Sequence, residues 1–454
     1  MSKPSLARGT RDFGPEQMAK RNFIFETIRR SFQRYGFLPL ETPAFENLSV
    51  LMGKYGEEGD QLLFKILNSG DFSGKLVEKD LLDGYKPLTS KISEKGLRYD
   101  LTVPFARYVV MNRGTLAMPF KRYQIQPVWR ADRPQRGRYR EFYQCDADVV
   151  GTDSLLCEAE IVNLLHDILP ALGIDDFTVK INNRKILTGI ADIIGAEGME
   201  GPLCVAIDKL DKIGKDKVVD ELSERGFTDT SIELLNPIFS LSDGDEPFSE
   251  LRNWLQNSEI ALKGIAELEE VWNMVKLLGL ENAKIQFDVT LARGLSYYTG
   301  AIFEVKANNV QMGSICGGGR YDNLTGTFGV PGISGVGISL GVDRIYDVME
   351  ELNFFPDNQT TSTKIMLSNF DREAFQFGLS ILPKLRLAGI NTEMYPDSVK
   401  LKKQLDYADR KNIPFVVLIG SDEIQSGLLT LKNMKTGEQQ KVSVDDIISI
   451  VLNS

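Results

Sequence analysis

Histidine is nearly absent from this chain of 454 residues, which contains only His166. A single histidine excludes any multi-histidine metal site. His166 lies in the apolar run 162–169, which has helical spacing, so we expect it to have a structural role at a helix edge. A Ser-His-Asp triad and a Cys-His dyad are then excluded too, because both require a catalytic imidazole. Any chemistry here must proceed without a histidine side chain.

Other common features are also missing. The four cysteines form no CxxC pair, so we expect reduced thiols, a cytoplasmic location and no zinc site. No apolar run reaches the roughly 18 residues that cross a bilayer, so we expect no membrane association. The sequence has no GxxxxGK[ST] phosphate loop, and the glycines at 335–341 do not form a dinucleotide-binding fingerprint.

The composition is that of an ordinary globular protein, with 42% hydrophobic and 26% charged residues. The length predicts about two or three domains. A formal net charge of −10 argues against nucleic-acid affinity over the whole surface. A local basic groove stays possible, because phosphate binding depends on where the charge lies.

The first part of the chain predicts a sheet. Residues 18–35 have the spacing of an amphipathic helix, and residues 36–43 read as a strand interrupted by prolines, which predicts a sheet edge or an interface. Strand-like stretches follow at 97–102, 121–129 and 141–150. Polar turns rather than long crossover helices join them, which favours an antiparallel sheet.

Helical patterns at 209–225 and 248–278 predict an inserted helical subdomain, with the acidic stretch 242–246 as a surface loop. Residues 353–362 have the composition of a linker, and strand–helix alternation after them predicts a separate small α/β domain. We therefore expect a catalytic core in two parts, an insertion and a terminal domain, with bounds at 1–195, 196–272, 273–352 and 363–454.

The densest charge feature is residues 129–140, where five arginines stand against Asp132. The planar fork of arginine suits phosphate oxygens, so a strand, an arginine-rich loop and a strand form a credible triphosphate clamp. Phe142 could offer a purine a stacking face. The alternative is a solvated basic hairpin.

Polar side chains occur on two further segments. Asp100 and Thr102 end a strand-like stretch with a carboxylate and a hydroxyl. Gln144, Asp146 and Asp148 are two apart, so they share one face of a strand. A pocket lined by carboxylates fits an ammonium group or an N–H donor, although these carboxylates could instead pair with nearby arginines.

Two motifs are the most specific. Residues 291–300 read LARGLSYYTG and carry Arg293, Tyr297 and Tyr298, and residues 316–322 read CGGGRYD. We interpret them as a strand that leads toward a glycine-rich turn. Together they can hold a phosphate and a small flat polar ring. Residues 334–344 are glycine-rich and end in Arg344 on an apolar helix, which alone is weak evidence of a site.

These motifs resemble those of the histidyl-tRNA synthetases, and the resemblance covers nearly the whole chain. Residues 7–12 resemble the amino-terminal segment of the family, the region of Pro43 its dimer-forming motif 1, residues 129–144 its motif 2 and residues 335–344 its motif 3. Residues 291–300 and 317–322 resemble two signatures peculiar to the family, and residues 420–423 and 432–439 resemble its anticodon-binding domain.

The resemblance implies an α/β (α+β) fold: a class II synthetase antiparallel sheet flanked by helices, a helical insertion and a C-terminal mixed α/β anticodon-binding domain. It implies ATP-dependent ligation of L-histidine to its tRNA through a histidyl-adenylate, with release of AMP and pyrophosphate. ATP as substrate, Mg²⁺ bound mostly by the nucleotide, tRNA and a homodimer follow from it.

The resemblance also implies roles for individual residues. Arg293 and Arg130 would be catalytic and hold the α-phosphate. Histidine would be bound by Asp100, Thr102, Gln144, Asp148, Tyr297 and Tyr298, and ATP by Arg130, Asp132, Arg138, Phe142 and Arg344. Two departures stand out: motif 2 usually has Glu where this chain has Asp132, a shorter acid that keeps the charge but alters its reach, and the family often has Asp at Ser296.

The sequence leaves two alternatives. A synthetase-like regulatory subunit of ATP phosphoribosyltransferase would typically lack both the terminal domain and the catalytic arginine, and this chain has both. A threonyl-, prolyl- or glycyl-tRNA synthetase could share the terminal domain type. The pair Tyr297–Tyr298 after Arg293 argues against that reading.

Overall fold

The computed structural model describes residues 3–74, 76–82, 84–207, 209–240, 248–280, 284–292, 297–356 and 363–453. The chain divides into two compact units. One consists of Met1–Arg11 and Phe23–Phe355, and the other of Asp12–Asn22 and Pro356–Ser454. The first unit contains two sheets and the second contains one, and each unit has its own apolar core.

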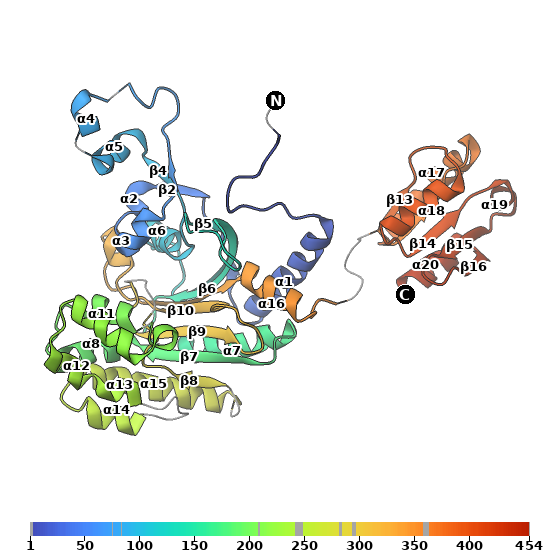
Figure 1. Cartoon of the computed structure of the whole chain (residues 1–454). Helices are drawn as coiled ribbons and strands as arrows, with labels where there is room; N and C mark the ends of the chain where they lie inside the picture. Colours follow the sequence, from blue (N-terminus) through green and yellow to red (C-terminus); the bar gives the residue numbers. More distant parts are fainter. Residues whose placement is uncertain are drawn as a thin grey trace. The chain divides into compact units, whose positions relative to one another are not determined.

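The first unit is built on an eight-stranded sheet (Figure 1) with strand order β1-β5-β6-β11-β10-β9-β7-β8. The pairs β1–β5 and β7–β8 are parallel, and the other neighbouring pairs are antiparallel. The strands are β1 (Leu38–Pro39), β5 (Phe120–Trp129), β6 (Glu141–Val150), β7 (Phe177–Asn183), β8 (Ile285–Phe287), β9 (Ala301–Ala307), β10 (Cys316–Arg320) and β11 (Gly335–Gly341). The predicted antiparallel core is confirmed, and the proline-containing β1 lies at its edge.

Side-chain alternation on β6 gives the sheet two different faces. Cys145, Ala147 and Val149 are buried in the apolar core, whereas Gln144 and Asp148 point to the other face, where they line a cleft. The helices that bury residues in this core include α1 (Pro15–Arg34, from its second half), α7 (Leu156–Ala171), α15 (Glu259–Leu277) and α16 (Val342–Glu351). The sheet therefore has one face for packing and one for polar chemistry.

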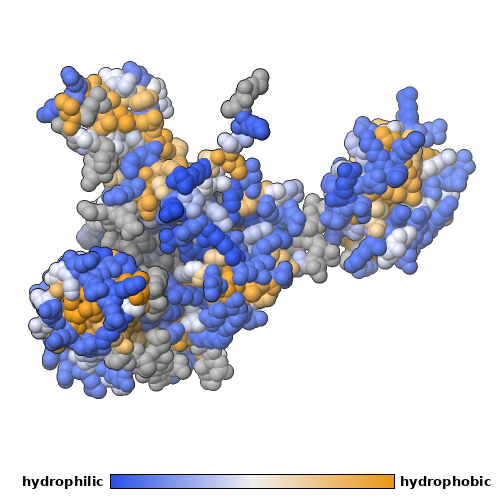
Figure 2. Space-filling view, viewed as in Figure 1, coloured by the Kyte–Doolittle hydropathy of each residue, from blue (hydrophilic) through white to orange (hydrophobic). Residues whose placement is uncertain are grey.

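The segment that contains a smaller three-stranded sheet contributes one wall of the cleft, through residues outside the strands such as Tyr55, Gly59 and Leu62. The order of this sheet is β2-β4-β3, with β2 (Phe45–Asn47), β3 (Lys65–Ile66) and β4 (Lys95–Leu97). The helices of this segment are α2 (Leu48–Leu51), α3 (Gly56–Gln61), α4 (Glu78–Leu82), α5 (Tyr85–Ile92) and α6 (Thr102–Asn112). The predicted strand at 97–102 was wrong beyond Leu97, because Thr102 already begins α6. Figure 2 shows hydrophobic residues gathered over the α4–α5 segment.

Between β7 and β8 every described element is a helix: α8 (Arg184–Ile193), α9 (Glu200–Ile207), α10 (Leu210–Ile213), α11 (Lys215–Glu224), α12 (Asp229–Leu234), α13 (Asn236–Ser240), α14 (Phe248–Trp254) and α15. Two long predicted helices are each divided. Gly214 has φ 79° between α10 and α11, and Ser258 caps α15 through Ala261 N–H after a short break. The predicted acidic loop 242–246 lies outside the described residues.

The apolar core continues from the large sheet into these helices. Ile265, Leu268 and Val271 of α15 are fully or almost fully buried in it. The helix α15 therefore belongs to the packing of the core. The bounds of 196–272 for the insertion stay a prediction.

The second unit contains a five-stranded sheet of order β13-β12-β14-β15-β16, with β12 (Ile365–Leu367), β13 (Thr392–Met394), β14 (Phe415–Leu418), β15 (Leu429–Asn433) and β16 (Gln439–Val442). The first three strands are mutually parallel, and β14–β15 and β15–β16 are antiparallel. Its helices are α17 (Arg372–Leu387), α18 (Leu401–Arg410), α19 (Ser421–Ser426) and α20 (Val444–Leu452). This is the predicted small α/β domain. Among the described helices of either unit, none is long and apolar enough to cross a membrane.

Candidate active site

The polar face of the large sheet forms the floor of a cleft of about 790 Å³. It brings together residues from segments far apart in the chain. The sequence-predicted residues that line it are Asp100, Thr102, Arg130, Asp132, Arg138, Phe142, Gln144, Asp148, Tyr297, Tyr298 and Arg344. Arg293 lies outside the described residues, although Ala292 and Tyr297 on either side of it are described. The structure thus brings together the described members of the predicted set, while the role of each residue stays a prediction.

Glycines open the floor of the cleft. Gly337 of β11 stands opposite Asp148 of β6 on one side and Gly319 of β10 on the other. A Cβ at Gly337 would lie 2.0 Å from Asp148 Oδ1, and a Cβ at Gly319 would lie 2.8 Å from the ring of Tyr298. The Asp148 and Tyr298 side chains therefore occupy space that only glycine leaves. The glycines at 317–319 lie within β10, so the predicted glycine-rich turn was wrong.

The predicted strand through 291–300 was also wrong in its described part. Leu291 and Ala292 belong to no strand, Tyr297 lies in a turn, and β9 begins only at Ala301. The backbone N–H of Thr299 donates to the carbonyl of Arg320 at 2.8 Å, which attaches this loop to the end of β10. Tyr298 is thereby placed over the glycine floor.

Asp148 is 2% exposed and lies between two partners. The Tyr321 hydroxyl donates to its Oδ1 at 2.6 Å, and a guanidinium nitrogen of Arg122 is 2.9 Å from its Oδ2. Burial raises the pKa of Asp148, while the positive charge of Arg122 and the hydrogen bond from Tyr321 lower it. The neighbouring Asp146 is also buried, and burial is the main cause that raises its pKa to about 7.

Asp100 is the second buried carboxylate of the predicted histidine site. Its Oδ1 accepts from the Tyr55 hydroxyl at 3.0 Å and from Val103 N–H at 3.1 Å, and its Oδ2 accepts from the Tyr297 hydroxyl at 3.3 Å. Burial raises the pKa of Asp100, and the Val103 N–H and the charge of Arg130 oppose that change. This carboxylate is rigidly oriented at the α6 end of the cleft.

The arginine hairpin joins β5 to β6, as predicted. Arg130 donates through Nε to the carbonyl of Tyr99 at 3.1 Å. Its guanidinium stacks 4.2 Å from the ring centre of Tyr99 and 5.2 Å from that of Phe142. The isolated bridge between Gln135 and Arg138 closes the hairpin tip, where Arg138 is exposed. Arg130 is thus held between aromatic rings, whereas the side chain of Arg138 is exposed.

Residues at the start of α16 also line the cleft. Arg344 donates through Nε to the carbonyl of Gly137 at 2.9 Å and through Nη1 to the carbonyl of Ser314. Asp343 beside it pairs with Arg11, and its Oδ2 accepts from Tyr143 N–H at 3.0 Å. The amino-terminal segment, the hairpin and α16 are therefore joined around the cleft.

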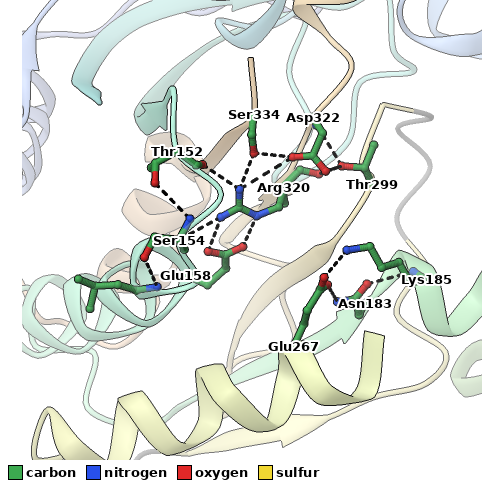
Figure 3. Close-up of polar contacts among 11 residues, drawn as sticks. Thr152, Ser154, Glu158, Asn183, Lys185, Glu267, Thr299, Arg320, Asp322 and Ser334 are labelled. Atoms are coloured by element: carbon green, nitrogen blue, oxygen red, sulfur yellow. Dashed lines mark hydrogen bonds and ion pairs between the residues drawn. The ribbon is translucent and has the colours of Figure 1, made fainter. Parts of the chain in front are cut away.

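A buried polar network lies behind the glycine strand (Figure 3). Arg320 is 4% exposed and pairs through Nε and Nη2 with the carboxylate of Glu158 of α7. Its Nη1 donates to the Ser334 hydroxyl at 2.6 Å, and Ser334 in turn donates to Asp322. The Thr299 hydroxyl donates to Asp322 at 2.7 Å. The network fixes both segments that carry the tyrosines of the site.

Sequence reasoning gave no role to Arg122, Tyr55 or Tyr321. Arg122 had a detectable signal, since it shares one strand face with Gln124 and Gln126, two and four residues further on. Tyr55 had no detectable signal in the sequence, because it lies between the short helices α2 and α3. His166 lies outside the cleft lining: its Nδ1 is 2.9 Å from the carbonyl of Val162, and its ring packs on Phe177. That arrangement fits the predicted structural role.

The sheet is mostly antiparallel and carries an arginine hairpin between two adjacent strands. A glycine-rich strand is followed by a helix with an arginine at its start. Together these features define a class II aminoacyl-tRNA synthetase. The family model described as Histidyl-tRNA synthetase matches residues 89–345, and the model described as Anticodon binding domain matches residues 363–454. The chain belongs to the histidyl-tRNA synthetase family.

Individual relatives agree with this assignment. The chain is 64% identical over 449 residues to a protein of Cytophaga hutchinsonii named Histidine--tRNA ligase, with 99% of each chain covered. It is 56% identical to a protein of the same name from Bacteroides fragilis, with 98% of each covered. A crystal structure of histidyl-tRNA synthetase from a Nostoc species superposes with a TM-score of 0.82 at 31% identity, over 100% of both chains.

Proposed function

We propose that this protein is an enzyme that ligates L-histidine to its cognate tRNA with ATP. In the first step the histidine carboxylate attacks the α-phosphate of ATP, and pyrophosphate leaves. In the second step a hydroxyl of the terminal ribose of the tRNA attacks the histidyl-adenylate, and AMP leaves. Histidine brings an ionised carboxylate, so the first step needs no general base, which suits a chain with one histidine outside the cleft lining.

The observation that carries the proposal is the 64% identity, over 99% of both chains, to a protein named Histidine--tRNA ligase. The experiment is pyrophosphate exchange with each of the twenty amino acids, followed by charging of total tRNA. Exchange that depends on histidine alone is expected. Exchange with threonine, proline or glycine would favour another synthetase, and its absence with every amino acid would favour a regulatory protein.

In this proposal Arg130 and Arg293 hold the α-phosphate and stabilise the charge that develops on it. The geometry of Arg130 supports this role, because Tyr99 and Phe142 fix its guanidinium at the mouth of the cleft. Phe142 stacks on the adenine, and Asp132 completes the ATP contacts of the hairpin. Arg138 and Arg344 bind the outer phosphates.

The histidine substrate lies on the glycine floor. Asp148 and Tyr298 bind its imidazole ring with Tyr297 beside them, and Asp100, Thr102 and Gln144 hold its ammonium group. The burial of Asp148 and Asp100 supports this division, since each carboxylate is 2–3% exposed and strongly prefers a positive or N–H-donating partner. A buried polar pocket of this kind rejects isosteres that lack the matching donor.

Magnesium enters with ATP. Among the residues that the structure describes, no group of three or more His, Cys, Asp or Glu side chains could hold a metal ion. Oxygen ligands are what Mg²⁺ prefers, and a nucleotide supplies them from its own phosphates. In the proposal the protein therefore binds the magnesium–ATP complex through its arginines.

The tRNA is bound by more than one part of the chain. Residues 363–454, which match the anticodon-binding model, take the anticodon. We assign 1–195 and 273–352 to the catalytic core and 196–272 to an insertion that contacts the tRNA. The exclusively helical character of the described part of that insertion supports its separate role.

The protein acts as a homodimer in the cytoplasm in this proposal. The edge strand β1 belongs to the segment that resembles motif 1, and two large apolar side chains are exposed in that segment, Leu38 (58%) and Phe45 (50%). Apolar residues at a sheet edge are typical of an interface between chains. Light scattering at several protein concentrations tests the dimer.

A further inference from the structure

Arg122 of β5 is completely buried directly below the proposed histidine site. Its guanidinium is 2.9 Å from Asp148 Oδ2, stacks 4.3 Å from the ring centre of Phe105, and donates to the carbonyl of Leu101 at 3.3 Å. Its Nε and Nη1 have no hydrogen-bond partner among the described residues. A buried arginine with so few hydrogen bonds is costly, so its charge must be balanced by the carboxylates next to it.

Two carboxylates share this single cation. Asp148 stands opposite Arg122 in the β5–β6 register, and Asp146 is the next residue on the same face of β6. Asp146 is 2% exposed, and its Oδ1 has no hydrogen-bond partner within the described part of the chain. Both carboxylates line the cleft, whereas Arg122 does not. The unit of three charges therefore presents a net negative charge toward the substrate when both acids are ionised.

We infer that Arg122 and Asp146 are positioning residues that set the pH range over which Asp148 can bind the histidine ring. Arg122 keeps Asp148 ionised and oriented from below, and Asp146 opposes that effect by like-charge repulsion. Neither residue needs to touch the substrate for this. The inference rests on the proposed role of Asp148 as the carboxylate that binds the ring.

The other groups around the pair are few. Tyr321 donates to Asp148, and the Ser339 hydroxyl, which accepts from Gln144 Nε2 at 2.6 Å, is opposite Asp146 in the β6–β11 register. Asp100 faces Asp146 from the start of α6 and raises its pKa slightly further. Glu304 of β9 is in the same cross-strand row, separated from β6 by β11 and β10. Arg122 lowers the pKa values of both acids, and the buried Arg98 is a second cation that interacts electrostatically with Asp146.

The inference predicts opposite effects for the two residues. Loss of the Arg122 charge raises the pKa of Asp148, because an adjacent cation favours the ionised acid by about 1–3 pH units. Loss of the Asp146 charge lowers the pKa of Asp148, because a like charge is removed. Asp148 must be ionised to accept from the ring, so histidine binding weakens as pH falls through its pKa. Combining both changes brings the midpoint back toward the wild-type value.

The experiment measures the KM for histidine in pyrophosphate exchange at saturating ATP between pH 5.5 and 9. The variants are Arg122→Met, Arg122→Lys, Asp146→Asn and the double variant Arg122→Met/Asp146→Asn. The matched control is Lys121→Met, the next residue on β5, which removes a charge that pairs with Glu160 away from the cleft lining. The imidazole and ammonium groups of free histidine titrate in every variant, so they cancel from the comparison.

We expect the midpoint to rise by about one pH unit or more in Arg122→Met and to fall in Asp146→Asn. The double variant should lie between them, and Arg122→Lys and Lys121→Met should stay near wild type. A purely structural role for Arg122 would raise the histidine KM equally at every pH and leave the midpoint unchanged. That result, or an Asp146→Asn midpoint equal to wild type, overturns the inference.

Two measurements keep the outcome interpretable. If Arg122→Met does not fold, judged by thermal unfolding, Asp146→Asn and Arg122→Lys still test the direction of each effect. Wild-type exchange decides the proposed function separately: no histidine-dependent exchange contradicts the function itself, whereas normal exchange with unshifted midpoints contradicts only the inference.

Discussion

The hydroxyl of Tyr321 donates a 2.6 Å hydrogen bond to Oδ1 of Asp148, 173 residues away in the sequence. Asp148 belongs to the strand that follows the arginine hairpin, and Tyr321 follows the glycine strand β10. The bond therefore links β6, which follows the arginine hairpin, to residues 317–322, which resemble a signature of the histidyl-tRNA synthetase family. It also leaves the carboxylate oriented over Gly337, where the proposed ring pocket lies.

Replacing Arg293 by Ala should leave a folded protein that has lost adenylation. Removing one preorganised charge donor from a transition state costs about 3–4 kcal/mol, or roughly a hundredfold to a thousandfold in rate. Histidine-dependent pyrophosphate exchange measures the loss, with Arg225→Ala, directly after α11, as the control. Activity within threefold of wild type would contradict the assigned role.

Asp148→Asn and Tyr298→Phe should impair histidine use far more than ATP use. Loss of a charged hydrogen-bond acceptor in a buried pocket costs about 1.5–3 kcal/mol, so the histidine KM of Asp148→Asn should rise roughly tenfold to a hundredfold. The effect of Tyr298→Phe should be smaller. Exchange kinetics with each substrate varied in turn separate the two KM values. A shift in the ATP KM alone would mean that these residues serve the nucleotide.

Gly337→Ala should disturb the same pocket without removing a functional group. The added Cβ would lie 2.0 Å from Asp148 Oδ1 and 3.0 Å from the carbonyl of Ala147, so the carboxylate must move. We expect the histidine KM to rise about tenfold, with little change for ATP. Gly114→Ala is the control, because nothing lies within 4 Å of its Cβ. An unchanged histidine KM would show that the glycine floor is not needed.

Asp146 makes stability depend on pH. Its folded-state pKa of about 7 is above the ordinary value of 3.8, so its contribution to stability is present below pH 3.8 and is lost as pH rises through 7. Asp146→Asn removes this loss of stability. The Tm of the variant minus the Tm of wild type should therefore be larger at pH 8 than at pH 5. Calorimetry at both values tests it, with the exposed Asp153→Asn as control. A Tm difference that stays constant with pH would contradict the prediction.

The terminal domain should bind RNA through α18. Lys402 and Lys403 are exposed there, whereas Lys411 forms an ion pair with Glu393 at 2.6 Å and is less available. Lys402→Glu/Lys403→Glu should weaken tRNA affinity and reduce its dependence on salt, because each phosphate contact contributes about one unit to the salt slope. Histidine-dependent exchange should stay normal.

The matched control for α18 is Lys364→Glu/Lys384→Glu, since both lysines are exposed in the same domain. Filter binding of tRNA at several salt concentrations measures both pairs. Equal losses in the two double variants would mean that only the net charge of the domain matters, and that α18 is not the RNA-binding surface.

Much of the site could be read from local patterns. The hairpin 129–140 and the polar alternation on β6 were predicted correctly, because a strand places every second side chain on one face. The strand at 97–102 and the glycine turn at 317–319 were wrong. Glycine favours turns locally, but in β10 the neighbouring strands on both sides and the rings above it decide the conformation. The long helices were divided at Gly214, which adopts a positive φ, and at Ser258, which caps the start of α15.

By itself, the sequence determined which side chains are available for chemistry: one histidine, an arginine-rich hairpin, alternating acids and paired tyrosines, in motifs specific enough to indicate the family. Only the tertiary structure decided which of these groups share one buried environment. Arg122, Asp148, Gly337 and Tyr321 meet through strand register across β5, β6 and β11 and the chain after β10. Register depends on long-range pairing and burial, and burial in turn sets the pKa values, so neither could be obtained from local sequence alone.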